Sequence, residues 1–233
     1  VPPPIEGPST GEMVGLDLGV AVSVMTSEGE AFQAPMLRPR LAERLLRLQR
    51  RLARALRGSN RRQRIKRAIA KIRARDKDRR KDWVEKTTTG LASRYDVLKV
   101  EALNIAGMTR SAKGTIASPG RKVAQKAGLN RAILAQGWSL FLFRLGHKAN
   151  GRVRRVDAKY TSQKCSACGH VAAESRESQA RFCCVACGFT LNSDHNAALN
   201  IAAGQAVTAR GDRISQRRSM NREPHLRLLS EVA

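Results

Sequence analysis

The stretch MVGLDLGV, residues 13–20, places a single charged side chain, Asp17, inside a short apolar run. A short apolar run of this length is typical of a buried strand. A carboxylate in such a strand destabilises the fold by several kcal/mol unless it is paired or binds a metal. Two interpretations stay open: Asp17 ends a strand or begins a turn, or it belongs to a functional site.

Apolar runs and amphipathic runs alternate along the rest of the chain. The patterns predict strands at 13–18, 20–26, 30–34, 97–100 and 152–156. They predict a helical hairpin over 38–81 and helices at 82–93, 130–148 and 194–205. Residues 106–127 lack periodicity and are expected to form a loop. Strands followed by helices interleaved with further strands predict an α/β fold with a mixed sheet.

The net charge of the 233-residue chain is +25, which predicts a polyanionic partner, most simply nucleic acid. Hydrophobic residues make up 42% of the chain, enough for a core, whereas the 4% of aromatic residues argues against base stacking as the main contact. No apolar run approaches the roughly 18 residues of a membrane span. No secretory signal is visible at the start, so we expect no membrane partner.

Much of the charge lies in residues 38–81, which hold 20 Lys and Arg against three acidic residues. Leucines and isoleucines recur there every three or four residues, and Gly58-Ser59-Asn60 interrupts them, so two amphipathic helices are expected. One interpretation is a solvated basic helix pair; the other is a surface for phosphates, which would relieve the self-repulsion. On the second, the expected nucleic-acid contacts are Arg47, Arg50, Arg51, Arg54, Arg61, Arg62, Arg64, Lys66, Arg67 and Lys71.

Two C-x-x-C pairs, Cys165/Cys168 and Cys184/Cys187, are separated by 15 residues. This spacing is typical of a structural zinc site with four thiolate ligands. A glycine follows each pair and allows the backbone to turn back toward the sulfurs. The alternative is four reduced thiols in a core. Cys183 is left over, and it or His170 could replace one ligand, although Cys184 keeps the two-residue gap to Cys187.

Two further carboxylates stand at structurally marked positions. Glu101 follows the apolar run 97–100, and Asp194 opens the helix of SDHNAALNIAAG. Taken alone, Glu101 could be an exposed strand end and Asp194 a helix N-cap. Together with Asp17 in a basic chain, they predict a site in which two divalent cations, Mg²⁺ or Mn²⁺, act on a phosphodiester.

The segments GLDLGV, VLKVEALNI, NRAILAQGW and KCSACG…FCCVACG…SDHNAALNI resemble TnpB, the OrfB-type transposon-encoded protein family related to the type V CRISPR effectors. The resemblance implies an RNase H-like (RuvC-type) sheet with a zinc ribbon inserted between the second and third acidic motifs. It implies RNA-guided cleavage of DNA, with Asp17, Glu101 and Asp194 as the catalytic triad and a guide RNA and DNA as partners. A cytoplasmic, nucleoid-associated prokaryotic protein is therefore expected.

The resemblance also sets expected boundaries: a linker at 1–12, a nuclease core at 13–158 with the basic hairpin 38–81, a zinc ribbon at 159–192, a helix at 193–210 and a disordered basic tail at 211–233. Two departures stand out. Asn192-Ser193-Asp194 stands where the family often has Asp-Arg-Asp. The sequence starts just before the first expected strand, so the family's region that holds guide RNA and reads the target-adjacent motif is not expected within it.

Several functions are compatible with these residues. The first is a metal-dependent DNA endonuclease. The second is a truncated, non-catalytic remnant that binds nucleic acid. A basic structural component of a ribonucleoprotein would explain the charge and the cysteines but not Asp17, and a transposase that joins DNA is a further possibility. The guide, the target motif and the oligomeric state do not follow from the sequence.

Overall fold

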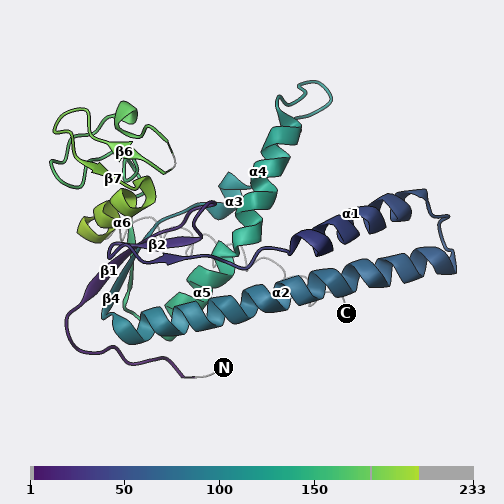
Figure 1. Cartoon of the computed structure of the whole chain (residues 1–233), viewed down its shortest axis with the longest axis horizontal. Coiled ribbons are helices and arrows are strands. Elements are labelled where there is room, and N and C mark those ends of the chain that lie inside the picture. The colour runs from purple at the N-terminus through teal and green to yellow at the C-terminus, as the bar shows by residue number, and fades with distance from the viewer. Residues whose placement is uncertain (1–2, 179, 205–233) are drawn as a thin grey trace, which may run out of the picture.

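A five-stranded mixed sheet forms the centre of the computed structural model, which describes residues 3–178 and 180–204 (Figure 1). The strand order is β3-β2-β1-β4-β5. Strands β1 (Met13–Asp17), β4 (Val97–Glu101) and β5 (Val153–Val156) run parallel. Strand β2 (Val24–Thr26) pairs antiparallel with β1, and β3 (Ala31–Phe32) pairs antiparallel with β2. The predicted mixed α/β fold is therefore confirmed.

The two faces of the central strands have different roles, because side chains alternate along a strand. Val14, Leu16, Leu98 and Val100 point into the main core. Helix α5 (Trp138–Lys148) and the C-terminal part of α2 (Asn60–Arg94) cover that face with Val84, Leu91, Phe141 and Leu145. The alternate positions, 15, 17, 99 and 101, therefore face the other side of the sheet.

Helix α6 (Ser193–Ala203) packs on that second face, against β1. A Cβ at Gly15 would lie 2.2 Å from the carbonyl oxygen of Ala198, so only glycine allows this approach. Lys99 reaches across the same face, and its Nζ donates to the carbonyl oxygens of Ala202 (2.7 Å) and Gly204 (2.9 Å). A lysine at this position satisfies the terminal carbonyls of the helix and is favoured by its dipole.

Helices α1 (Pro39–Arg54) and α2 pack against each other through a small apolar cluster that is separate from the main core. Its buried members are Leu48, Ile65, Ile69 and Ile72. The expected interruption at 58–60 is present: Gly58 has a φ of +81°, and the Ser59 hydroxyl accepts a hydrogen bond from the amide of Arg62 at the start of α2. Figure 1 shows α1 and the first half of α2 extending away from the sheet.

Three expectations about helices need correction. Residues 82–93 do not form a separate helix, because α2 continues without a break through the charged stretch around the Asp76–Arg80 ion pair. The expected helix 130–148 is two helices, α4 (Val123–Gln136) and α5, separated at Gly137, whose φ is +73°. The expected loop 106–127 contains most of α3 (Ile105–Met108) and the start of α4.

The break at Gly137 has a physical cause. The buried amide of Gln136 donates to the carbonyl of Val20 (2.9 Å) and accepts from the Ser23 hydroxyl (2.6 Å), which fixes the end of α4 to the turn between β1 and β2. Beyond Gly137 the chain turns so that Trp138 and Phe141 enter the core. An isolated glycine within an apolar pattern does not reveal such a change of direction.

The cysteine-containing segment lies between β5 and α6 and forms a separate small unit beside α6 (Figure 1). It contains the short helix η1 (Ala173–Ser175) and a strand pair, β6 (Phe182–Cys183) and β7 (Thr190–Leu191). Among the described helices, none is long and apolar enough to span a membrane. The expected tail 211–233 and the end of the 193–210 segment lie outside the described residues.

Gly15→Ala should destabilise the fold by about 2 kcal/mol or more, because the new methyl group meets helix backbone that cannot move without lifting α6. Gly146→Ala in α5 is the control: a Cβ at Gly146 would meet no neighbouring atom within 4 Å, so about 0.5–1 kcal/mol of stabilisation is expected. Thermal unfolding followed by circular dichroism measures both. Equal stabilities for the two variants would contradict the close packing of α6 on β1.

Candidate acidic site and cysteine cluster

Asp17 and Glu101 end two neighbouring parallel strands. Leu16 pairs with Val100 in the register of β1 and β4, so the next residue of each strand is the carboxylate. Both side chains are on the face that carries α6, by the alternation described above. The first turn of α6 contributes Asp194, which is 4% exposed. The fold thus brings together all three predicted carboxylates.

The pKa of Asp17 depends on the charges of the other two carboxylates. Burial raises the pKa of Asp17 to about 7, and the charges of Glu101 and Asp194 contribute to the same rise. Burial also raises the pKa of Glu101 and of Asp194. Three carboxyl groups that hold protons more tightly than usual favour a positive partner, which makes this a candidate functional site.

An arginine from the cysteine-containing unit supplies part of that positive charge. Arg176, just after η1, lies 3.5 Å from Asp194 through its Nη2 and the Oδ1 atom. Its charge opposes the upward pKa shifts of all three carboxyl groups. Sequence analysis missed Arg176, because one arginine among 44 Lys and Arg carries no signal of its own.

A second group missed by sequence analysis is Thr161. Its hydroxyl donates a hydrogen bond to Glu101 Oε1 and lowers the pKa of that carboxyl against the effect of burial. Thr161 and Arg176 both come from the segment between β5 and α6. That segment therefore touches two of the three carboxylates.

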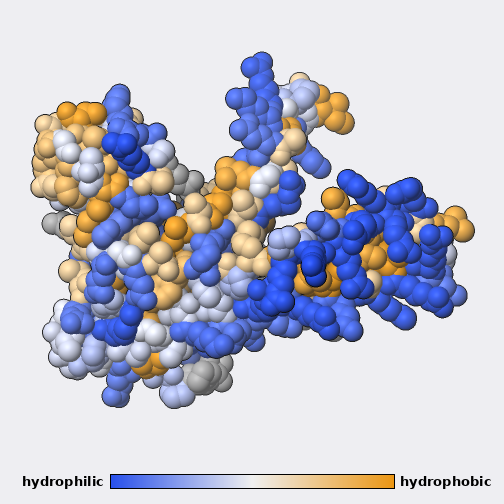
Figure 2. Space-filling view, viewed as in Figure 1, coloured by the Kyte–Doolittle hydropathy of each residue, from blue (hydrophilic) through white to orange (hydrophobic). Residues whose placement is uncertain are grey.

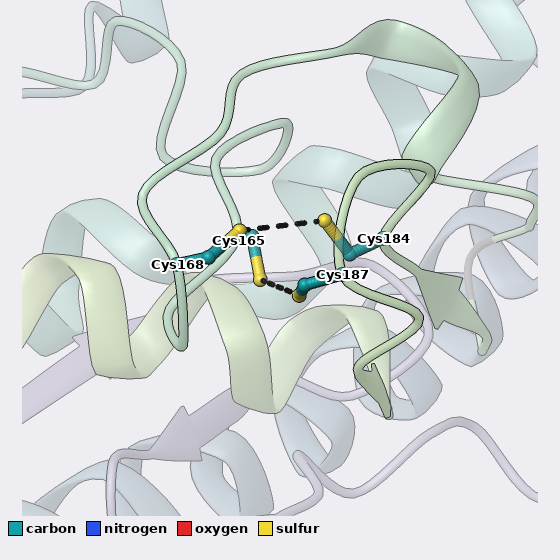
Figure 3. A group of neighbouring side chains, drawn as sticks. All are labelled: Cys165, Cys168, Cys184 and Cys187. Atoms are coloured by element: carbon teal, nitrogen blue, oxygen red, sulfur yellow. Dashed lines mark hydrogen bonds between the residues drawn. The ribbon is translucent and has the colours of Figure 1, made fainter.

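The four cysteines form the tightest cluster of possible metal ligands in the described part of the chain. Their sulfurs all lie within 4.8 Å of one another, with 3.8 Å between Cys165 and Cys187 and 3.6 Å between Cys168 and Cys184 (Figure 3). A tetrahedral ion with metal–sulfur bonds of about 2.3 Å needs sulfurs about 3.8 Å apart. The four cysteines are thus positioned to bind a metal in the manner of a zinc ribbon.

The two cysteine pairs are built alike. The amide of Cys165 donates to His170 O (2.8 Å), and that of Cys184 donates to Phe189 O (2.8 Å). Gly169 and Gly188 each donate back to the first cysteine of their pair (2.9 Å), with φ values of +78° and +72°. Amides of Cys187 and Ala186 lower the pKa of Cys184 to about 6, whereas, against the effect of the Phe189 amide, contacts with the other three thiols raise the pKa of Cys187 to about 12, so without a metal the cluster shares its protons unevenly. Cys183 and His170 lie outside the cluster.

The acidic site is more open than the cysteine cluster. Within the residues that the structure describes, only the cysteines have ligand atoms this close together, so the three carboxylates do not form an equally tight group. Their hard oxygen atoms suit Mg²⁺ or Mn²⁺.

The basic residues predicted to contact nucleic acid lie on α1 and the first part of α2 (the basic arm, residues 39–81). Figure 2 shows many strongly hydrophilic side chains along this arm, with apolar ones between them. Nine of the ten predicted residues are exposed. Arg62 is half-buried, and its Nη1 donates to the carbonyl oxygens of Leu52 (2.7 Å) and Ala55 (3.1 Å), which caps the end of α1.

Comparison with known proteins matches both halves of the chain. Residues 1–112 match the OrfB_IS605 family, described as "Probable transposase", and residues 138–201 match the Cas12f1-like TNB domain. InsQ of Escherichia coli (strain K12), named as a putative RNA-guided DNA endonuclease, is 41% identical over 216 residues, 91% of this chain and 54% of InsQ. The chain is thus similar to the OrfB (TnpB) family over most of its length.

Cas12f1 proteins match the chain as well. The CRISPR-associated endodeoxyribonuclease Cas12f1 of Sulfoacidibacillus thermotolerans is 49% identical over 55 residues, 24% of this chain and 13% of that protein. A solved Cas12f1–sgRNA–target DNA complex superposes with a TM-score of 0.51 at 19% identity, covering 85% of this chain and 51% of the other, so the fold is shared. The chain spans about half the length of InsQ.

Asp17→Asn should stabilise the chain at pH 8 in buffer without added divalent cations. The pKa of Asp17 is about 7 in the folded chain and 3.8 ordinarily, so its ionisation destabilises the fold progressively between about pH 4 and 7. The gain should be near zero at pH 4 and roughly 2–4 kcal/mol at pH 8. Thermal unfolding across pH measures it, with Asp78→Asn at an exposed position of α2 as control. If the difference in stability between Asp17→Asn and wild type did not change with pH, that would argue against a buried acidic site.

Metal analysis should find about one zinc ion per chain, because four thiolates leave no further ligand position. Cys184→Ser should lose the ion, since it removes a sulfur from the cluster. Cys183→Ser, the same change one residue earlier, should keep it. Inductively coupled plasma mass spectrometry of the purified variants distinguishes the two. Loss of zinc in Cys183→Ser would mean that Cys183 itself is a ligand.

Proposed function

We propose that the chain provides the nuclease domain of an RNA-guided DNA endonuclease, with an RNase H-like (RuvC-type) sheet. The observation that supports it most is the convergence of Asp17, Glu101 and Asp194 from β1, β4 and α6 on one face of the sheet. The strand order, with β1 between an antiparallel and a parallel neighbour, is compatible with that fold. The names of InsQ and Cas12f1 support the same activity.

The proposed chemistry is hydrolysis of a DNA phosphodiester. Divalent cations held by the three carboxylates would supply an activated water and stabilise the leaving oxygen. The residues of the chain itself would hold the cations in place. Asp17 and Glu101 offer oxygens from adjacent strands, and Asp194 faces them from α6. The raised pKa of Asp17 means that cation binding displaces a proton near neutral pH.

Arg176 has a defined place in this proposal. Its guanidinium is already next to the carboxylates and carries several N–H donors in a fixed fork. In the complex it would donate to a non-bridging phosphate oxygen of the scissile strand and stabilise the charge that develops there. The same group lowers the repulsion between the carboxylates before substrate binds.

The basic arm would bind the phosphate backbones of the guide RNA and the DNA target. Arg47, Arg50, Arg51 and Arg54 lie on α1, and Arg61, Arg64, Lys66, Arg67 and Lys71 on α2. Contacts of this kind position a duplex by its backbone and shape without reading its sequence. A structural zinc ion in the cysteine cluster completes the proposed cofactors.

One alternative rests on a specific observation. The chain spans about half of InsQ, so it could bind nucleic acid through the basic arm and the cysteine-containing unit without cleaving it. Binding and cleavage depend on different residues, which lets one experiment separate these functions.

The decisive test is cleavage of single-stranded and duplex DNA in low salt with Mg²⁺ or Mn²⁺, comparing wild type with Asp17→Asn. We expect the variant to lose at least about 100-fold in rate while its binding, followed by fluorescence anisotropy, stays within about twofold. Glu12→Gln, which removes a negative charge from an exposed residue ahead of β1, should cleave normally. Salt-sensitive binding without cleavage by any of the three proteins would favour the binding-only alternative.

A further inference from the structure

Thr161 connects the cysteine-containing unit to the acidic site. It is 7% exposed and lies in the turn ahead of the first cysteine pair. Its hydroxyl donates to Glu101 Oε1, so a residue outside the sheet helps to fix the orientation of a carboxylate at the end of β4. Nothing else in the described hydrogen-bond network holds the Glu101 side chain.

The backbone of the same turn is held by helix α6. The side-chain amide of Asn200 donates to the carbonyl oxygens of Thr161 (2.9 Å) and Lys164 (2.6 Å). One helical turn earlier, Asn196 donates to Lys164 O (2.8 Å) and accepts from the amide of Ser166 (3.0 Å). Both asparagines are buried: Asn196 is 0% exposed and Asn200 is 8% exposed.

The placement of these amides is informative because α6 is otherwise rich in alanine. Residues four apart lie on one face of a helix, so Asn196 and Asn200 present their amides to the same segment, residues 161–166. Buried amides are tolerated only when hydrogen bonded, and here each one has partners in that segment. The helix that carries Asp194 therefore also carries the groups that hold Thr161.

A second connection lies at the start of α6. The Ser193 hydroxyl donates to the carbonyl of Ser178 (2.9 Å), and Arg176 pairs with Asp194. The cysteine-containing unit thus contacts α6 at its first turn and again two turns later. These contacts surround the acidic site on the side away from the main core.

We propose that Thr161 and Asn200 are positioning residues for the acidic site: Thr161 orients Glu101, and Asn200 holds Thr161 at a fixed distance from the helix that bears Asp194. The proposal builds on the proposed nuclease function. Its physical basis is that hydrogen bonds behind a ligand orient that ligand before the metal arrives. The cysteine-containing unit then helps to set the spacing of the carboxylates, in addition to any metal that it binds.

Substitution of Thr161 tests the orientation of Glu101. Thr161→Val keeps the shape of the side chain and removes the hydroxyl, whereas Thr161→Ser keeps the hydroxyl. We expect Thr161→Val to weaken Mn²⁺ binding at the acidic site about 10-fold or more, and Thr161→Ser to stay within about twofold of wild type. Electron paramagnetic resonance of free Mn²⁺ measures the affinity directly, without any cleavage. Thr87→Val, at an equally buried threonine of α2, is the matched control.

Equal Mn²⁺ affinity in Thr161→Val and wild type would overturn the role of Thr161. Equal weakening in Thr161→Val and Thr161→Ser would overturn it as well, since packing rather than the hydroxyl would then matter. If wild type binds Mn²⁺ with the expected pattern among the variants but does not cleave DNA, the positioning role stands and the nuclease proposal fails.

A second measurement is independent of divalent cations. Asn200→Ala should raise the amide hydrogen exchange of residues 161–166 about 10-fold or more while the chain keeps its zinc, because both carbonyl partners of the amide are released. Asn130→Ala in α4, whose amide donates to Thr109 O (2.8 Å), should leave that segment unchanged. Unchanged exchange in Asn200→Ala would overturn the positioning role even if wild type binds no Mn²⁺.

Discussion

The close approach of helix α6 to strand β1 is the contact on which the site depends. At Gly15 the helix backbone takes the space of a side chain, and Lys99 from the next strand fixes the C-terminal end of the helix. This places the first turn of α6, with Asp194, opposite the ends of β1 and β4. A residue larger than glycine at position 15 would separate Asp194 from Asp17 without altering any of the charged groups.

Bringing three carboxylates together under partial burial destabilises the chain, as the raised pKa of Asp17 shows. The structure offsets this repulsion with one arginine and one hydroxyl, and both come from a unit with a very small core. The buried cluster of that unit is Cys165, Cys184 and Phe182. Such a core is too small to order a loop of this length by itself, so a metal bound by the four sulfurs would supply the missing stability. The cysteine cluster and the acidic site are then coupled energetically, although their chemistry is separate.

The sequence predicted the parts of this arrangement that depend on local pattern. Glu101 could be placed at a strand end because it follows an apolar run, and Asp17 was marked as a charge inside one; the structure ends β1 at Asp17, and the parallel strands bring the two carboxylates to one edge. Gly137 interrupts α4–α5 because Gln136 is fixed to Val20 and Ser23, a contact more than a hundred residues away that no local pattern reveals. Arg176 and Thr161 were missed for a related reason: their roles arise only when the segment between β5 and α6 folds back over the sheet. Arg62 shows the converse, since a residue in a basic run is used to cap a neighbouring helix.

The distribution of charge explains how one chain can combine an acidic site with a net charge of +25. A carboxylate cluster repels a phosphodiester, so the site alone has no affinity for DNA. The basic arm has its own apolar cluster and extends away from the sheet that carries the carboxylates (Figure 1). The positive charge that lowers the pKa values of the three carboxyl groups is that of Arg176, which lies outside the arm. On the proposed function, attraction to the nucleic-acid backbone and repulsion at the scissile phosphate would therefore be set by different residues, and bound cations together with Arg176 would offset the repulsion.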